Sequence, residues 1–148
     1  MTGEYAVQTS WLIPFDGSAH SLRALDLAVS EAKARQITPT LVLLNVQMPL
    51  PSDITRFIDS NTVDDHHREE GEKVLACAKE RLSASSLIHS FHILVGDVSK
   101  TILEVASSSC CSMIIMGSHG HGSVKGLFVG SVTTKVLHSA IVPVLLVK

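Results

Sequence analysis

Short apolar stretches alternate with longer amphipathic stretches along this chain. The apolar stretches are Trp11–Phe15, Thr38–Val46, Leu87–Val95, Cys111–Met116 and Pro143–Val147. Each is a candidate β-strand. Thr38–Val46 is apolar at nearly every position, which indicates a strand buried on both faces of a sheet. The pattern therefore predicts five strands.

The amphipathic stretches predict four helices between these strands. The first helix begins after Ser18, and the second spans about Val63–Leu82. The third begins after Asp97, which can cap it, and the fourth spans about Ser131–Ser139. Apolar residues recur every three or four positions in each, so each helix has one face to bury. The expected core-facing residues are Leu22, Leu25, Val29 and Ala32, then Leu75, Ala78 and Leu82, then Val98, Ile102 and Val105, and finally Val132, Val136 and Ala140.

Alternating strands and helices predict an α/β fold whose parallel sheet carries helices on both faces. Right-handed crossovers leave few arrangements, and a doubly wound five-stranded parallel sheet of order 3-2-1-4-5 is favoured. Ligands of such sheets bind beyond the carboxyl ends of the strands, where the winding reverses. Asp16 and Gly117 follow the two strands that flank this point. We expect one domain over residues 1–148 with its site at this edge.

Composition and charge exclude several classes of function. The net charge is −2 and the basic residues are scattered, so no basic stripe for nucleic acid is present. No apolar run approaches the roughly 20 residues of a membrane-spanning helix, and the first ten residues lack the pattern of a signal peptide. Cys77, Cys110 and Cys111 form no C-x-x-C pair, which is typical of reduced cytosolic thiols. We expect a cytoplasmic protein without nucleic-acid or membrane partners.

A glycine-rich stretch, MGSHGHGSVKGLFVGSVTTKV, joins the fourth strand to the last helix. A Walker A loop is excluded because the chain has no Gly-Lys pair, and a Rossmann fingerprint would follow the first strand. What remains is the spacing Gly117-x2-Gly120-x9-Gly130-Ser131. Gly117 and Gly120 would let backbone N–H groups approach phosphate oxygens. Gly130 and Ser131 open the last helix, whose free N–H groups and dipole favour an anion.

At these positions the chain resembles the nucleotide-binding branch of the universal stress protein family, whose signature is G-x2-G-x9-G-[ST]. Further segments resemble the family in the same order, namely Pro14–Ser18, Leu43–Val46, Gly96-Asp97 and Val142–Val147. The resemblance implies ATP as ligand. Hydroxyl and backbone donors would accommodate a triphosphate best with Mg²⁺ sharing its charge, so ATP with Mg²⁺ is the expected form. It also implies that Asp16 accepts a hydrogen bond from a ribose hydroxyl and that the backbone of Val46 contacts adenine. The implied nucleotide-binding residues are Pro14, Phe15, Asp16, Val46, Gly117, Ser118, His119, Gly120, Gly130, Ser131, Val132 and Thr133, with hydroxyl donors at Ser131 and Thr133.

Other histidine, lysine, glycine and cysteine residues have simpler interpretations than a role in the site. His119 and His121 form an H-x-H pair without a third ligand, so we expect no metal site. The pair His66-His67 is expected on a solvated helix face. Lys125 either contacts a phosphate or is solvated at a loop tip, while Gly122 and Gly126 are assigned to the bend of the loop. Cys110 and Cys111 are expected to pack inertly.

The predicted site favours binding over catalysis. It holds no arginine and one carboxylate, and it lacks an evident base to orient water, so we expect no enzyme. Two alternatives stay open, namely a slow ATPase or phosphotransferase at the same site and a nucleotide-independent interaction module. The final strand lies at the sheet edge yet is uniformly apolar, which predicts a homodimer through Val144–Val147. The segment Pro49–Asn61 is expected on the ligand side, where it could shape selectivity or cover the pocket.

Overall fold

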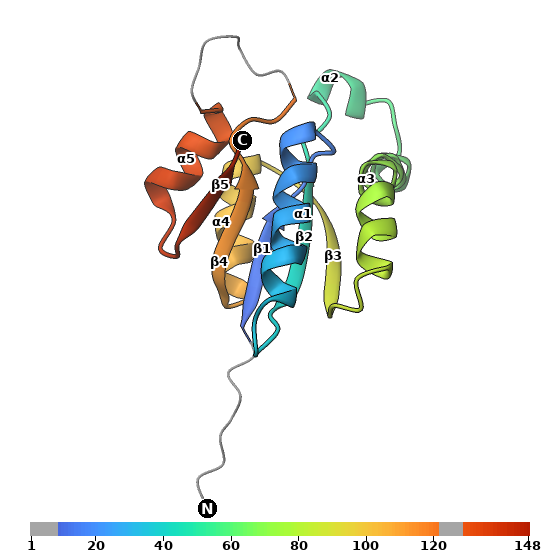
Figure 1. The fold of residues 1–148 in the computed structure, drawn as a ribbon. Coiled ribbons are helices and arrows are strands. Elements are labelled where there is room, and N and C mark those ends of the chain that lie inside the picture. Colours follow the sequence, from blue (N-terminus) through green and yellow to red (C-terminus); the bar gives the residue numbers. More distant parts are fainter. Residues whose placement is uncertain (1–8, 122–128) are drawn as a thin grey trace, which may run out of the picture.

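Five parallel strands form one sheet in the order β3-β2-β1-β4-β5, as predicted (Figure 1). The computed structural model describes residues 9–121 and 129–148, so Gly122, Lys125 and Gly126 lie outside the described residues. The strands are β1 (Ser10–Pro14), β2 (Thr40–Gln47), β3 (His89–Val95), β4 (Cys111–Gly117) and β5 (Val144–Val147). Each strand lies within two residues of its predicted bounds.

Helices cover both faces of this sheet, as Figure 1 shows. They are α1 (Ala19–Lys33), α2 (Ser52–Thr55), α3 (Ser60–Ser83), α4 (Val98–Ser108) and α5 (Ser131–Ser139). One apolar core lies between the sheet and α1 with α3, and a second lies between the sheet and α4 with α5. Among the described residues, no helix is both long and apolar enough to cross a membrane.

The helix starts follow from local capping. The side chain of Ser18 accepts a hydrogen bond from the backbone of Ser21, and Asp97 caps α4 as predicted by accepting from the backbone of Lys100. The helix predicted from about Val63 begins earlier, because Asp59 caps α3 by accepting from the backbone N–H of Asn61. The short helix α2 was not predicted and lies within the segment Pro49–Asn61.

The prediction that His66 and His67 lie on a solvated helix face is confirmed for His66, which is exposed, and is wrong for His67. His67 is 5% exposed because it shares the inner face of α3 with Gly71, Leu75 and Ala78. The expected burial of Leu75, Ala78 and Leu82 is confirmed.

Candidate functional site

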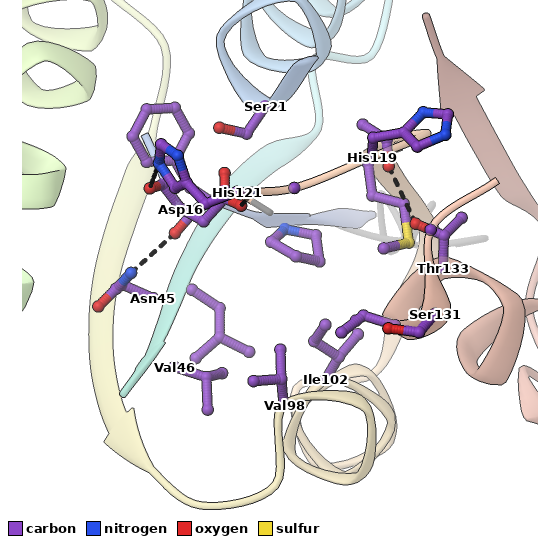
Figure 2. Close-up of a pocket in the computed structure, with 18 of the residues that line it drawn as sticks. Asp16, Ser21, Asn45, Val46, Val98, Ile102, His119, His121, Ser131 and Thr133 are labelled. Carbon is purple, nitrogen blue, oxygen red and sulfur yellow. Dashed lines mark hydrogen bonds between the residues drawn. The ribbon is translucent and has the colours of Figure 1, made fainter. Parts of the chain in front are cut away.

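A cavity of about 500 Å³ opens at the carboxyl ends of β1, β2 and β4 (Figure 2). It lies at the point where the winding of the sheet reverses, as the topology predicts. Every predicted site residue lines it except Ser118. Residues that the sequence did not assign to the site also line it, namely Ser21, Leu44, Asn45, Gln47, Met48, Val98, Ile102, Met116 and His121.

Asp16 is the one carboxylate among the described residues that line this cavity. Its Oδ1 accepts a hydrogen bond from the backbone N–H of Ser18 at 2.9 Å, and its Oδ2 accepts one from the backbone N–H of His121 at 3.1 Å. Burial alone would raise the pKa of Asp16, but hydrogen bonds from Ser18, Ser21 and His121 outweigh it and leave the pKa below its ordinary value. Asp16 is therefore ionised at neutral pH and held in one orientation.

Two glycines of the motif are required by packing inside the protein. A Cβ on Gly120 would lie 2.5 Å from Oδ2 of Asp16. A Cβ on Gly117 would lie 2.6 Å from the Cβ of His20 and 2.8 Å from its carbonyl carbon, at the first turn of α1. The sequence suggested these glycines for the approach of phosphate. The structure gives a second reason for them, because they let the carboxylate of Asp16 and helix α1 pack closely against this segment.

The N-terminus of α5 opens into the same cavity. Gly130 precedes the helix in an extended conformation and supplies no side-chain cap. The N–H of Thr134 donates to the carbonyl of Gly130, as the first hydrogen bond of the helix. The preceding N–H groups belong to Ser131, Val132 and Thr133, and none of them donates to an acceptor within the described part of the chain. Three donors and the positive end of the helix dipole are thus available for an anion.

Two of the implied nucleotide-binding residues, Ser118 and Thr133, form hydrogen bonds within the protein. Ser118 is 2% exposed, its N–H donates to the carbonyl of Val147 and its own carbonyl accepts from Gly130. It extends the β4–β5 pairing, which explains why it does not line the cavity. The hydroxyl of Thr133 donates to the carbonyl of Gly117 at 3.1 Å and ties α5 to the end of β4. Of the two hydroxyls expected as donors, only that of Ser131 is exposed.

One wall of the cavity is apolar and includes the end of β2. Figure 2 shows Val46, Val98 and Ile102 together on this wall. The β1–β2 ladder stops at the pair Pro14 and Leu44. Because backbone groups point alternately to the two sides of a strand, those of Val46 point toward β1, beyond its last ladder pair. The wall thus pairs an apolar surface with a backbone donor and acceptor.

Histidines flank the cavity near the end of β4. The rings of His20 and His119 lie 5.3 Å apart between centroids, and His119 Nδ1 lies 3.1 Å from the hydroxyl of Ser118. Burial, then Arg23 and His119, lower the pKa of His20. Among the described residues, no group of three or more His, Cys, Asp or Glu side chains is arranged to hold a metal ion.

The model of the universal stress protein family matches residues 11–148. The chain belongs to this family. Universal stress protein YxiE of Bacillus subtilis is 30% identical, covering 93% of this chain and 97% of that protein. A universal stress protein of Thermus aquaticus is 31% identical, covering 93% of this chain and 96% of that protein.

Solved structures of other proteins share this universal stress protein fold. The hypothetical protein MJ0577 is 27% identical, with a TM-score of 0.82 and coverage of 95% of this chain and 96% of that one. Two other neighbours were solved with a nucleotide. One universal stress protein carries cAMP and another, from Archaeoglobus fulgidus, carries dAMP; they are 22% and 20% identical, with TM-scores of 0.69 and 0.68. At that identity these two show the fold alone.

Proposed function

We propose that this universal stress protein is a cytoplasmic regulator that binds ATP with Mg²⁺ and leaves it intact. The observation that carries the proposal is the convergence of three different surfaces on one cavity. They are the apolar wall with the open backbone of Val46, the oriented carboxylate of Asp16, and the free N–H groups at the start of α5. The cAMP and dAMP bound by two structural neighbours make adenine nucleotides the first ligands to test.

Each surface matches one part of such a nucleotide. An adenine ring has apolar faces and a polar edge, which suits the wall of Val98 and Ile102 beside the backbone of Val46. A ribose hydroxyl is a donor and suits the ionised Asp16. Phosphates suit the first turn of α5, where the N–H groups of Ser131, Val132 and Thr133 are available. Figure 2 shows Asp16 on one side of the cavity and Ser131 of α5 on the other, with Val46, Val98 and Ile102 along a third side.

Mg²⁺ would reach this site with the phosphates. The ion prefers oxygen ligands, usually one or two carboxylates together with substrate phosphates and water. Among the described residues that line the cavity, Asp16 is the only carboxylate, and it faces the proposed ribose position. The described residues thus supply no cage of their own, and the bound ion would offset phosphate charge in a cavity whose described lining contains no lysine or arginine.

The same lining supports binding without turnover. Phosphoryl transfer relies on charged clamps, metal ions and a residue that orients the attacking group. The described lining offers no cationic clamp, and its one carboxylate is held by Ser18 and His121. The slow ATPase alternative predicts phosphate release that disappears in Asp16→Ala. We expect purified protein to leave ATP unchanged over a long incubation.

Calorimetric titration with Mg·ATP tests the binding proposal. We expect the wild-type chain to bind and Asp16→Asn to bind about tenfold or more weakly, because it loses a charge-assisted hydrogen bond. Asp64→Asn is the matched control, since Asp64 is an exposed carboxylate of α3. Absence of ATP binding by the wild-type chain would refute the proposal and leave the nucleotide-independent interaction module.

We also propose a homodimer through β5. This strand lies at the edge of the sheet, and Leu145 within it is 37% exposed. Leu137 and Ile141, which precede the strand, are 44% and 90% exposed. Antiparallel pairing of β5 with its own copy would satisfy the edge and cover these side chains. Sedimentation should give a dimer for the wild type and a monomer for Leu145→Lys; a wild-type monomer at micromolar concentration would refute the dimer.

The cytoplasmic location rests on the thiols. All three cysteines are free, and Cys77 and Cys110 are exposed. Such thiols persist in a reducing compartment. Cell fractionation that places the protein outside the cytoplasm would contradict this part of the proposal.

A further inference from the structure

Two side chains from distant segments hold the backbone of Asp16. The chain leaves the sheet after Pro14, so the carbonyls of Phe15 and Asp16 lie beyond the β1 ladder. Asn45 of β2 donates from Nδ2 to the carbonyl of Phe15 at 2.9 Å. His121, which follows β4, lies with Nε2 2.9 Å from the carbonyl of Asp16. A carbonyl can only accept, so His121 carries its proton on Nε2 and donates it.

These two bonds act on the peptide planes on either side of the Asp16 Cα. The carbonyl of Phe15 belongs to the peptide plane that precedes this atom, and the carbonyl of Asp16 belongs to the plane that follows it. Because the backbone dihedral angles of Asp16 relate these two planes, fixing both planes fixes the direction of its Cα–Cβ bond. The carboxylate is then oriented by the N–H groups of Ser18 and His121.

Asn45 is itself held in place. It is 3% exposed, and its Oδ1 accepts a hydrogen bond from Nε2 of Gln47 at 2.6 Å. It interrupts the otherwise apolar inner part of β2, where an unpaired carboxamide would be costly. Its two bonds remove that cost and leave it one orientation, in which Nδ2 points to Phe15. Figure 2 shows Asn45 and His121 on the same side of the cavity as Asp16.

We propose that Asn45 and His121 are positioning residues that let Asp16 select ribonucleotides over deoxyribonucleotides. The inference rests on the proposed function and names the ligand class of the same site. A carboxylate fixed before the ligand arrives can bind a ribose hydroxyl without an ordering cost, whereas a mobile one gains little from that hydroxyl. Loss of either positioning bond therefore lowers the preference for the hydroxyl and leaves the rest of the ligand bound as before.

The test compares ATP with 2′-deoxy-ATP and 3′-deoxy-ATP by calorimetry on the full chain. Wild type should bind one deoxy form about tenfold more weakly than ATP, as expected for one hydrogen bond to a charged group. His121→Asn should bring the ratio near one with little change for that deoxy ligand, because an Asn amide reproduces Nδ1 and not Nε2. His121→Gln places a donor where Nε2 lies and should retain the preference.

Two further variants complete the comparison. Asn45→Leu should bring the ratio near one in the same way, and His66→Asn, an exposed histidine of α3, should leave it unchanged. His121 is exposed, so its variants test the inference even if Asn45→Leu destabilises the buried strand. Variants that weaken ATP and both deoxy ligands equally would overturn the inference and show a merely structural role.

A second readout needs no nucleotide. Carbon-13 NMR of the Asp16 carboxyl, assigned with Asp16→Asn, follows its titration in the free protein. We expect the midpoint to rise in His121→Asn and to stay near the wild-type value in His121→Gln. An unchanged midpoint in His121→Asn overturns the positioning role. Failure of the wild type to bind ATP overturns the proposed function and the ribose preference, and the titration still decides the positioning of Asp16.

Discussion

The same substitution at two glycines of the motif, Gly117 at the end of β4 and Gly120 after it, should have different consequences. In Gly120→Ala the new Cβ would lie 2.5 Å from Oδ2 of Asp16, which is the end of a side chain. In Gly117→Ala it would lie 2.8 Å from the carbonyl carbon of His20 and 3.0 Å from the backbone nitrogen of Ser21. A carboxylate can rotate away from such a contact, whereas the first turn of a packed helix cannot.

The magnitudes follow from what each contact displaces. Rotation of Asp16 gives up its bond from the His121 N–H and its alignment with ribose, so Gly120→Ala should weaken ATP binding by about 1.5–3 kcal/mol, roughly 10- to 150-fold. Its free energy of unfolding should change much less, since Gly120 is exposed and lacks a positive φ. Gly117→Ala should lower the free energy of unfolding by about 1–3 kcal/mol through overpacking.

A double-mutant cycle separates these effects. Urea unfolding and Mg·ATP calorimetry would be measured for Gly120→Ala, Asp16→Ala and the double variant. Because Gly120→Ala acts through Asp16, it should add little to the binding loss once the carboxylate is gone. Additive binding losses would refute this reasoning and show that the Cβ at position 120 obstructs the ligand directly.

Further predictions concern stability. The pKa of Asp16 lies below its ordinary value, so its contribution to the free energy of unfolding is present above the unfolded pKa and is lost as the pH falls through the folded pKa. Asp16→Asn should therefore flatten the acid side of a plot of unfolding free energy against pH, and an unchanged profile would contradict this. Gly17 has a φ of 80°, so Gly17→Ala should cost about 1–2 kcal/mol in urea unfolding, and a neutral result would exclude that strain. Asp97→Ala should cost about 1 kcal/mol by removing the cap of α4, with exposed Asp64→Ala as its control; equal effects of the two would argue against the cap.

The topology could be predicted because apolar strands and amphipathic helices alternate clearly and parallel sheets allow few connections. Helix α5 begins at Ser131 and ends at Ser139 as predicted, since the glycine before it and the strand after it delimit it. The start of α3 and the existence of α2 were missed because polar residues dominate there and a local cap at Asp59 decides the boundary.

Residues that line the cavity could be predicted where they follow directly from strand ends and the glycine spacing. Asn45 and His121 were missed because each forms its hydrogen bond with a segment far away in the sequence. Ser118 was included among the implied nucleotide-binding residues, and sequence spacing cannot show that its backbone is paired with Val147 and Gly130. The cytoplasmic location, the homodimer and the lack of nucleic-acid partners stay predictions.

The most direct test of the account is an amide NMR titration of the full chain with Mg·ATP. We expect the largest shifts at the N–H groups of Ser131, Val132 and Thr133, with further shifts at Val46. Shifts confined to other parts of the protein would contradict the account, for example shifts at a smaller cavity lined by Cys110 and Ile141. An unchanged spectrum at millimolar nucleotide would also contradict it.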